Sequence, residues 1–262
     1  MRLLEYQAKR LLEKYGVTVP RGMVITSHSE LQLISFPTVL KAQIPVGRRG
    51  KSGAVRFADN RAEAQSILED LQQSEIEGYP IKILLAEDLV KTEAEIYVAC
   101  LIDKLHNTHM IMACAAGGAE IEDVARTRPE TVIQVPIHPI VGIEDYMVRF
   151  LTKSLAITDG KGFSSLLNAL YSIALEMDAS LVEINPLAQT HTGLIALDAK
   201  VIIDDKAAFR HKDFVQKILA EQKNFDQRHR TKSQLLAETL NLNYLPLEGD
   251  IGSIADGLSL IH

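Results

Sequence analysis

Apolar residues recur near the start of the chain at the spacing of an amphipathic helix. They occupy Leu3, Leu4, Ala8, Leu11, Leu12 and Tyr15. Gly16 follows the last of them, at a place where a helix favours a residue that readily adopts a left-handed backbone. The pattern therefore predicts a first helix that ends before Gly16.

Further along, short apolar runs alternate with helical patterns. Strands are predicted at 37–42, 81–86 and 95–102, helices at 163–177 and 212–222, and a hairpin at 181–203. Asn60, with Glu63 three residues later, has the spacing of a capping box, so another helix should begin there and stop near Gly78. The interleaving of strands and helices predicts a fold of the α/β or α+β class.

The hydrophobic pattern weakens after residue 224. Residues 225–232 are polar and charged, as in a linker, and residues 242–253 have the pattern of one strand that runs into a glycine turn. A single strand cannot bury a core of its own. We therefore expect a main domain at 1–224, followed at 225–262 by a tail that packs on it or begins an incomplete domain.

Composition narrows the possible partners. The chain has 262 residues, 47% of them hydrophobic, and a formal net charge of -6. That charge argues against nucleic acid or an anionic membrane as the partner, because either requires a cationic field. No segment has the pattern of a signal peptide or a membrane span, so the cytoplasm is the expected location. Cys100 and Cys114 lie in apolar stretches and should be buried, reduced thiols.

The loop 47–53 combines three glycines with Arg48, Arg49 and Lys51. Glycines let backbone N–H groups turn toward an anion, but short basic clusters are also common on solvated surfaces, and both interpretations stay open. A P-loop is excluded because Pro45 stands where that motif requires its first glycine. Lys41 ends an otherwise apolar strand, so its ammonium should either reach water or face a ligand anion.

Two further segments are less informative by themselves. Glu87 and Glu95 flank an acidic stretch between two predicted strands, and the residues alone favour an exposed turn there. Gly117 and Gly118 precede an acidic segment, which favours a capped helix start over an anion site.

The predicted hairpin allows an argument from register. If it is symmetric about the turn at 190–193, Asn185 faces Asp198 and Glu183 faces Lys200. These four side chains then share one face, because side chains alternate along a strand. The other face should carry Val182, Ile184, Leu197 and Ala199. Two carboxylates and an amide oxygen are hard ligands that suit magnesium, which is favoured over the alternative of a cross-strand salt bridge.

Several of these segments, in order along the chain, resemble the β subunits of succinyl-CoA synthetases. The matching segments are 1–9, 39–51, 117–122, 183–187, 197–200 and 247–252. The resemblance implies an ATP-grasp fold of two lobes, with the small lobe at about 21–98. It also implies that 225–262 contains only the beginning of a C-terminal, flavodoxin-like CoA-ligase domain.

The same resemblance implies roles for individual residues, and it assigns no catalytic residue to this chain. The phosphates of ATP or GTP would contact Lys41, Arg48, Arg49 and Gly50. The base and the ribose would contact Glu87, Val90 and Glu95. Mg²⁺ would be held by Asn185 and Asp198. The implied partners are an α subunit that carries a phosphohistidine, a dicarboxylic acid and CoA.

Two positions depart from the family pattern. Arg48 replaces a glycine of the phosphate loop, and Asp256 replaces an asparagine on the substrate side, where a carboxylate would repel an acidic substrate. These departures keep open a second hypothesis, a divergent nucleotide-binding or regulatory module without ligase activity. Another ATP-grasp carboxylate ligase is less favoured, and the sequence does not choose among succinate, malate and citrate.

Overall fold

The computed structural model forms helix α1 where the apolar spacing predicted a helix. It runs over Glu5–Lys14, and the left-handed Gly16, with φ of 83°, follows its last turn. Leu11 and Leu12 join the largest hydrophobic core, while Tyr6 belongs to a small cluster with Leu85. Helix α1 therefore packs against more than one part of the chain.

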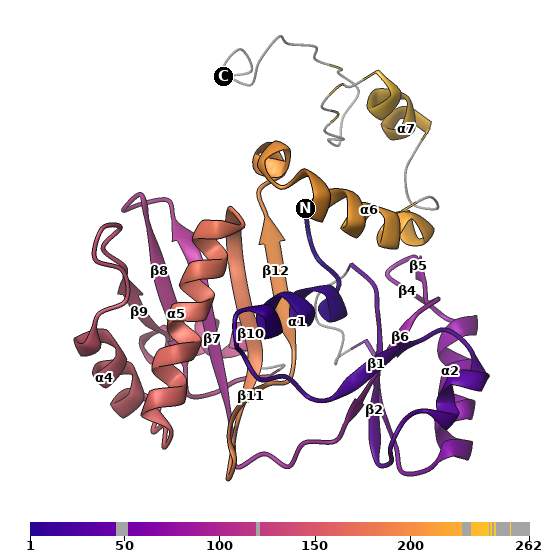
Figure 1. Ribbon diagram of the computed structural model, residues 1–262, viewed down its shortest axis with the longest axis horizontal. Coiled ribbons are helices and arrows are strands. Elements are labelled where there is room, and N and C mark those ends of the chain that lie inside the picture. The colour runs from indigo at the N-terminus through magenta and orange to yellow at the C-terminus, as the bar shows by residue number, and fades with distance from the viewer. Residues whose placement is uncertain are drawn as a thin grey trace. The chain divides into compact units, whose positions relative to one another are not determined.

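An antiparallel sheet of four strands forms the smaller lobe. Its order is β1 (Gly22–Ile25), β6 (Leu84–Asp88), β2 (Thr38–Ala42), β3 (Val55–Ala58). The 3-10 helix η1 (His28–Gln32) follows β1, and α2 (Arg61–Gln73) covers one face of the sheet (Figure 1). Leu40, Leu68 and Leu84 are fully buried between sheet and helices.

Asn60 caps α2 as predicted, since its side chain accepts a hydrogen bond from the Glu63 N–H at 3.0 Å. The predicted end near Gly78 is wrong. The helix stops at Gln73, and β4 (Glu75–Ile76) pairs with β5 (Tyr79–Pro80) in a short hairpin. Glu77 and Gly78 both have positive φ, which a tight turn requires, so a turn replaces the expected last helical residues.

The larger sheet has six strands. Its order is β11 (Gly193–Ala196), β10 (Ala179–Thr190), β7 (Ala94–Asp103), β8 (Thr108–Cys114), β9 (Ile133–Pro136), and β12 (Ala199–Ile203) also pairs with β10. Helices α4 (Asp145–Ser154) and α5 (Gly160–Glu176) lie on one face (Figure 1). On β7, Val98 and Cys100 point into the core that contains Phe163 of α5, and Tyr97 points to the opposite face. The α/β class predicted from the sequence is confirmed.

The remaining described elements are short helices and the helices that follow the hairpin. They are α3 (Ile121–Thr127), η2 (Pro129–Thr131), η3 (Asp205–Arg210), α6 (Lys212–Asp226) and α7 (Lys232–Thr239). The structure describes residues 1–45, 52–118, 121–226, 232–240, 242, 244 and 252. The predicted contacts Arg48, Arg49, Gly50 and Asp256 lie outside these residues.

The chain divides into two units, Met1–Phe225 and Asp226–His262. The first contains both sheets. Cys100 and Cys114 are free and buried, as predicted. Across the described residues, no helix combines the length and the apolar character that crossing a membrane would require.

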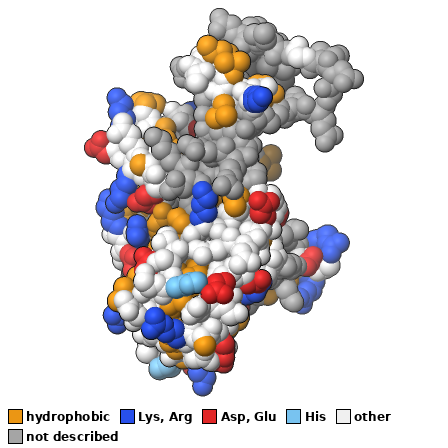
Figure 2. All heavy atoms as spheres, turned by 90° about the vertical axis from the view of Figure 1, so that its right-hand side faces the viewer, with side chains coloured by type: hydrophobic (Ala, Val, Ile, Leu, Met, Phe, Trp, Pro, Cys, Tyr) orange, Lys and Arg blue, Asp and Glu red, His pale blue; other side chains and the backbone are white. Residues whose placement is uncertain are grey.

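The outer side of the smaller lobe carries mixed charge. Figure 2 looks at the side on which α2 lies in Figure 1, and there the described Lys and Arg side chains lie among Asp and Glu side chains. Such interspersed charges are typical of a solvated surface. The candidate site lies elsewhere, at the cleft described next.

Candidate functional site

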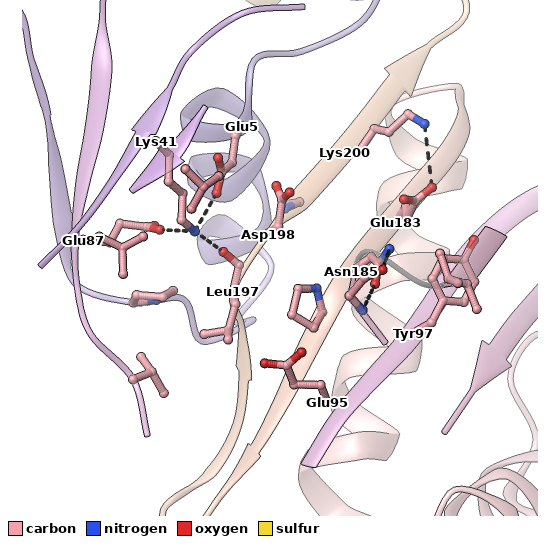
Figure 3. A pocket seen from close by; sticks show the side chains of 18 of the residues that line it. Glu5, Lys41, Glu87, Glu95, Tyr97, Glu183, Asn185, Leu197, Asp198 and Lys200 are labelled. Carbon is pink, nitrogen blue, oxygen red and sulfur yellow. Dashed lines mark hydrogen bonds and ion pairs between the residues drawn. The ribbon is translucent and has the colours of Figure 1, made fainter. Parts of the chain in front are cut away.

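A cleft of about 680 Å³ opens between the two sheets. Its walls include residues of β2, β3 and β6 of the smaller sheet, residues of β7, β8, β10 and β12 of the larger sheet, and Glu5 of α1. The volume is in the range of sites that bury a small organic ligand. Figure 3 shows the charged and polar side chains that converge there.

The hairpin places four polar side chains on one wall of the cleft, in the predicted register. Glu183 pairs with Lys200 across the strands, and the Asn185 N–H donates to the Asp198 carbonyl at 3.2 Å. All four side chains line the cleft. The salt bridge considered as an alternative is also present, as a pair with Lys200 Nζ 3.9 Å from Glu183 Oε2. Asn185 and Asp198 carry the other side-chain oxygens of this set, and each accepts a backbone N–H, from Gly118 and from Ala199 respectively.

The opposite face of the hairpin follows the prediction at Val182, Ile184 and Ala199, which lie in the main core. Leu197 does not. It lies between the end of β11 and the start of β12, where the strand alternation is interrupted, and its N–H donates to the Pro186 carbonyl at 3.0 Å. As a result Leu197 lines the cleft, and its carbonyl points toward Lys41 (Figure 3).

Lys41 is buried on the other wall, only 8% exposed. The prediction that its ammonium reaches water or faces a ligand anion is incomplete, because two protein carboxylates neutralise it. Lys41 Nζ lies 3.1 Å from Glu5 Oε1 and 2.6 Å from Glu87 Oε2, and it donates to the Leu197 carbonyl at 2.6 Å. Burial by itself lowers the pKa of Lys41, but attraction to Glu5, Glu87 and Asp198 outweighs burial and raises it.

Glu87 corrects the prediction of an exposed acidic turn. It ends a buried run on β6, is 3% exposed, and its carbonyl accepts a hydrogen bond from Thr38 Oγ1 at 2.9 Å. A carboxylate is buried this deeply only when it is paired, here with Lys41 and Lys9. Glu95, at the start of β7, is exposed as that prediction stated, and it still lines the cleft together with Val90.

The glycine pair Gly117 and Gly118 belongs to the site, although the sequence pattern favoured only a capped helix start there. The Gly118 N–H donates to Asn185 Oδ1 at 2.6 Å, and Asn185 Nδ2 donates to the Gly118 carbonyl at 3.1 Å. This pair of bonds orients the Asn185 amide. Gly117 lies so close to β7 that an added Cβ would come within 2.6 Å of the Ile96 carbonyl carbon. Two successive glycines after an apolar strand were the available signal.

Glu5, Lys9 and Tyr97 also belong to the site or its surroundings, and none of them was predicted from the sequence. Glu5 and Lys9 are 3% exposed, and only the tertiary structure shows that they pair with Lys41 and Glu87. Tyr97 lines the cleft, and burial, with a contribution from Glu183, raises the pKa of its phenol.

The donor chemistry of the hairpin wall fits magnesium bound jointly with a ligand. Among the described residues, no group of three or more His, Cys, Asp and Glu side chains has the arrangement of a metal site. Magnesium does not require one, because it is commonly held by one or two protein oxygens together with water and substrate phosphates. The Asp198 carboxylate and the Asn185 amide oxygen supply two such donors on the cleft wall.

Comparison with known proteins identifies the family. The model of the ATP-grasp domain family matches residues 2–189. The β subunit of the ADP-forming succinate–CoA ligase of Ignicoccus hospitalis is 36% identical over an alignment that covers 99% of this chain and 69% of that protein. The chain belongs to the ATP-grasp family of succinate–CoA ligase β subunits. The corresponding β subunit of Pyrobaculum aerophilum is 37% identical, with the same coverage.

Solved structures agree with the ATP-grasp fold. An ATP citrate lyase of Methanothrix soehngenii, solved with citrate and coenzyme A, superposes with a TM-score of 0.66 at 22% identity, covering 92% of this chain and 59% of that one. A dinucleotide-forming acetyl-coenzyme A synthetase of Ca. Korarchaeum cryptofilum gives a TM-score of 0.61 at 21% identity, covering 78% of this chain and 93% of that one. The ATP-grasp fold implied by the sequence resemblance is thereby confirmed.

Proposed function

We propose that this chain binds ATP or GTP with magnesium in its cleft and supplies the phosphoryl-transfer part of an acid–CoA ligase. One observation carries the proposal: a buried lysine, Lys41, on one wall of the cleft faces the oxygen donors Asn185 and Asp198 on the other (Figure 3). A lysine beside magnesium-type ligands suits the phosphates of a nucleotide, because catalysis of phosphoryl transfer depends chiefly on positioning and charge neutralisation.

The nucleotide contacts are assigned along the cleft. Lys41 would contact phosphate, and Glu87, Val90 and Glu95, all of which line the cleft, would hold base and ribose. The contacts from 48–50 remain predictions from the sequence resemblance.

Asn185 and Asp198 would hold the magnesium ion. When bound, magnesium neutralises phosphate charge and orients the phosphates. The two hydrogen bonds between Gly118 and Asn185 hold the Asn185 amide in a fixed orientation on the hairpin wall of the cleft. The chain's own contribution is therefore a preformed pair of oxygen donors opposite a lysine.

The relatives are named as β subunits, which supports a partner subunit. We propose that phosphate moves between the nucleotide and a phosphohistidine of an α subunit, and that the dicarboxylic acid and CoA are bound jointly with that partner. The isolated chain would then be inactive as a ligase. Asp256 is proposed as a residue near the acid substrate.

The magnesium assignment is tested with the variant Asp198→Asn. We expect this variant to weaken ATP binding in the presence of magnesium at least about tenfold, because the asparagine amide lacks the negative charge of the Asp198 carboxylate. Isothermal titration calorimetry with Mg²⁺, repeated with EDTA, checks this, and the difference from wild type should shrink with EDTA. Asp145→Asn, an exposed position on α4, is the matched control and should bind like wild type. Equal affinity of wild type and Asp198→Asn would contradict the assignment.

The ligase hypothesis and the regulatory-module hypothesis differ in one reaction. If this chain is a ligase subunit, mixing it with a succinate–CoA ligase α subunit and γ-labelled ATP should place acid-labile label on the α subunit. The Lys41→Met variant should lose that transfer. Tight MgATP binding without labelling of any α subunit tested would favour the regulatory module.

A further inference from the structure

The hairpin wall of the cleft carries a lysine of its own, Lys200 on β12. Its ammonium pairs with Glu183, but the 3.9 Å between Lys200 Nζ and Glu183 Oε2 is near the upper limit for an ion pair, and the Lys200 side chain is 36% exposed. Exposed pairs of this kind contribute little to stability. The Lys200 ammonium can therefore turn from Glu183 to a ligand at small cost.

Lys41, on the facing wall, is held much more firmly. It is buried, it pairs with Glu5 and Glu87, and it donates a hydrogen bond to the Leu197 carbonyl. These contacts fix the position of its ammonium, so a ligand has to come to Lys41. Lys200 differs because its ammonium can follow a group that moves within the cleft.

The strand register gives the order of the polar groups along the hairpin wall. Glu95 of β7 lies opposite the later part of β10, and Lys200 of β12 lies opposite Glu183 in its earlier part. Asn185 stands between these two points of β10, bonded to the Asp198 carbonyl across the hairpin. Along the cleft, the oxygen donors Asn185 and Asp198 therefore come between Glu95 and Lys200 (Figure 3).

This order places Lys200 where the end of a nucleotide's phosphate chain would lie. The proposed base and ribose contacts Val90 and Glu95 are at the other end of the wall, with the proposed magnesium ligands between. Lys200 follows Asp198 by two residues, so the two side chains point to the same face and are about 6.6 Å apart along the strand. A flexible lysine side chain can cover that separation.

We propose that Lys200 is a catalytic residue whose ammonium contacts the terminal phosphoryl group of the nucleotide and stays with that group during its transfer. The inference rests on the proposed nucleotide and magnesium site. A cation that moves with the phosphoryl group neutralises its charge before and after transfer, which a fixed cation cannot do equally well on both sides.

The transfer step leaves Lys200 chemically unchanged. The bond between the terminal phosphorus and the bridging oxygen breaks, and its electron pair stays on the nucleoside diphosphate. The imidazole of the acceptor supplies the electron pair for the new phosphorus–nitrogen bond and keeps its ring proton. Lys200 keeps its three protons and acts through charge and hydrogen bonds alone.

Binding tests the contact by comparing MgADP with the β,γ-imido analogue of MgATP, in calorimetry on the whole chain. MgADP lacks the group that Lys200 would contact, so Lys200→Met should bind it within about twofold of wild type and the analogue at least about tenfold more weakly. Lys206→Met, an exposed lysine of η3 outside the cleft, is the matched control and should bind both like wild type. In a folded variant, an equal loss with both nucleotides, or no loss with either, would overturn the proposal. Circular dichroism checks folding, and Lys200→Gln takes the place of Lys200→Met if that variant is unfolded.

A double variant separates a contact with phosphate from simple neutralisation of Glu183. If Lys200 only offset the charge of that carboxylate, Lys200→Met with Glu183→Gln would bind the analogue like wild type, and that result would overturn the proposal. We expect the double variant to remain at least about tenfold weaker than wild type, because the ammonium is still missing.

Transfer itself is measured with saturating MgATP and a succinate–CoA ligase α subunit. Lys200→Met should label the α subunit at least about tenfold more slowly than wild type, because it lacks the cation that accompanies the phosphoryl group. A wild-type rate of labelling would overturn the catalytic role.

The proposed function is judged by different results. If wild type binds neither nucleotide, or if Asp198→Asn binds both like wild type, the proposed nucleotide and magnesium site fails, and the role of Lys200 fails with it. If wild type binds both and Asp198→Asn binds them weakly, while Lys200→Met binds the analogue like wild type, only the role of Lys200 fails.

Discussion

Single residues show how burial changes the chemistry of a side chain. Lys41 and Glu87 are buried charged residues that follow apolar runs in their strands, and each is tolerated there because the other lies within ion-pair distance. The sequence around either residue does not indicate which residue it pairs with. Cys100 is the apolar counterpart, a thiol in the main core, where burial raises its pKa from the ordinary thiol value of 9.0 to about 12.

The raised pKa of Cys100 predicts a loss of stability at alkaline pH. Above pH 9 the unfolded chain releases the thiol proton while the folded chain keeps it, so the contribution of Cys100 to stability is complete below pH 9 and declines as the pH approaches 12. The decline can reach about 1.4 kcal/mol per pH unit. Urea unfolding of wild type and Cys100→Ala at several pH values checks this, and the variant should show a shallower decline. Parallel declines would contradict the prediction.

At the scale of elements, β7 and the segment after β8 bring the glycine pair against the hairpin. The Gly117 N–H donates to the Glu95 carbonyl at 2.9 Å, and Gly118 bonds to Asn185. The close approach requires that residue 117 lack a Cβ. The orientation of a proposed metal ligand therefore depends on the fit between two separate segments.

Gly117→Ala should disturb that fit. Because the new Cβ would meet β7 backbone, the segment must shift, and we expect a loss of stability of about 1–3 kcal/mol together with weaker MgATP binding. Gly160→Ala, at the first residue of α5, is the control. The new Cβ would lie 3.6 Å from Thr152 Cγ2 of α4, which is an ordinary contact, so this substitution should be neutral or stabilising. Denaturant unfolding and calorimetry measure both effects. Wild-type stability and affinity in Gly117→Ala would show that the segment adapts without cost.

At the scale of the whole molecule, the cleft belongs to the first unit of the chain. The described residues that line it fall between Arg2 and Lys200, and the described members of the two largest hydrophobic cores also lie before residue 226. Both lobes and α1 contribute to the walls. Nucleotide binding, as proposed, should therefore depend on the fold of Met1–Phe225.

Shortening the chain tests that dependence. A chain of residues 1–226, which keeps α6 complete, should fold and bind MgATP within about threefold of the full chain, because its core and cleft are retained. Circular dichroism, thermal unfolding and calorimetry check this. A folded 1–226 chain that has lost affinity would show that the C-terminal residues take part in nucleotide binding.

Features that depend on neighbouring residues could be predicted from the amino-acid sequence alone. The spacing of apolar residues located α1, the pair Asn60 and Glu63 located the start of α2, and strand alternation located the register of Glu183 opposite Lys200. Such periodicities follow from local backbone geometry, so they can be read without knowledge of the fold.

The pairing of distant charges, in contrast, depends on how the elements pack in three dimensions. Glu5 and Lys9 stand one helical turn apart on α1, but they meet Lys41 on β2 and Glu87 on β6 only through the packing of that helix against the sheet, which no local pattern predicts. The exposed turn expected at Glu87 was wrong for that reason. A buried charge is tolerated only where the fold places an opposite charge next to it. Whether it does so depends on packing between segments that are distant in the sequence.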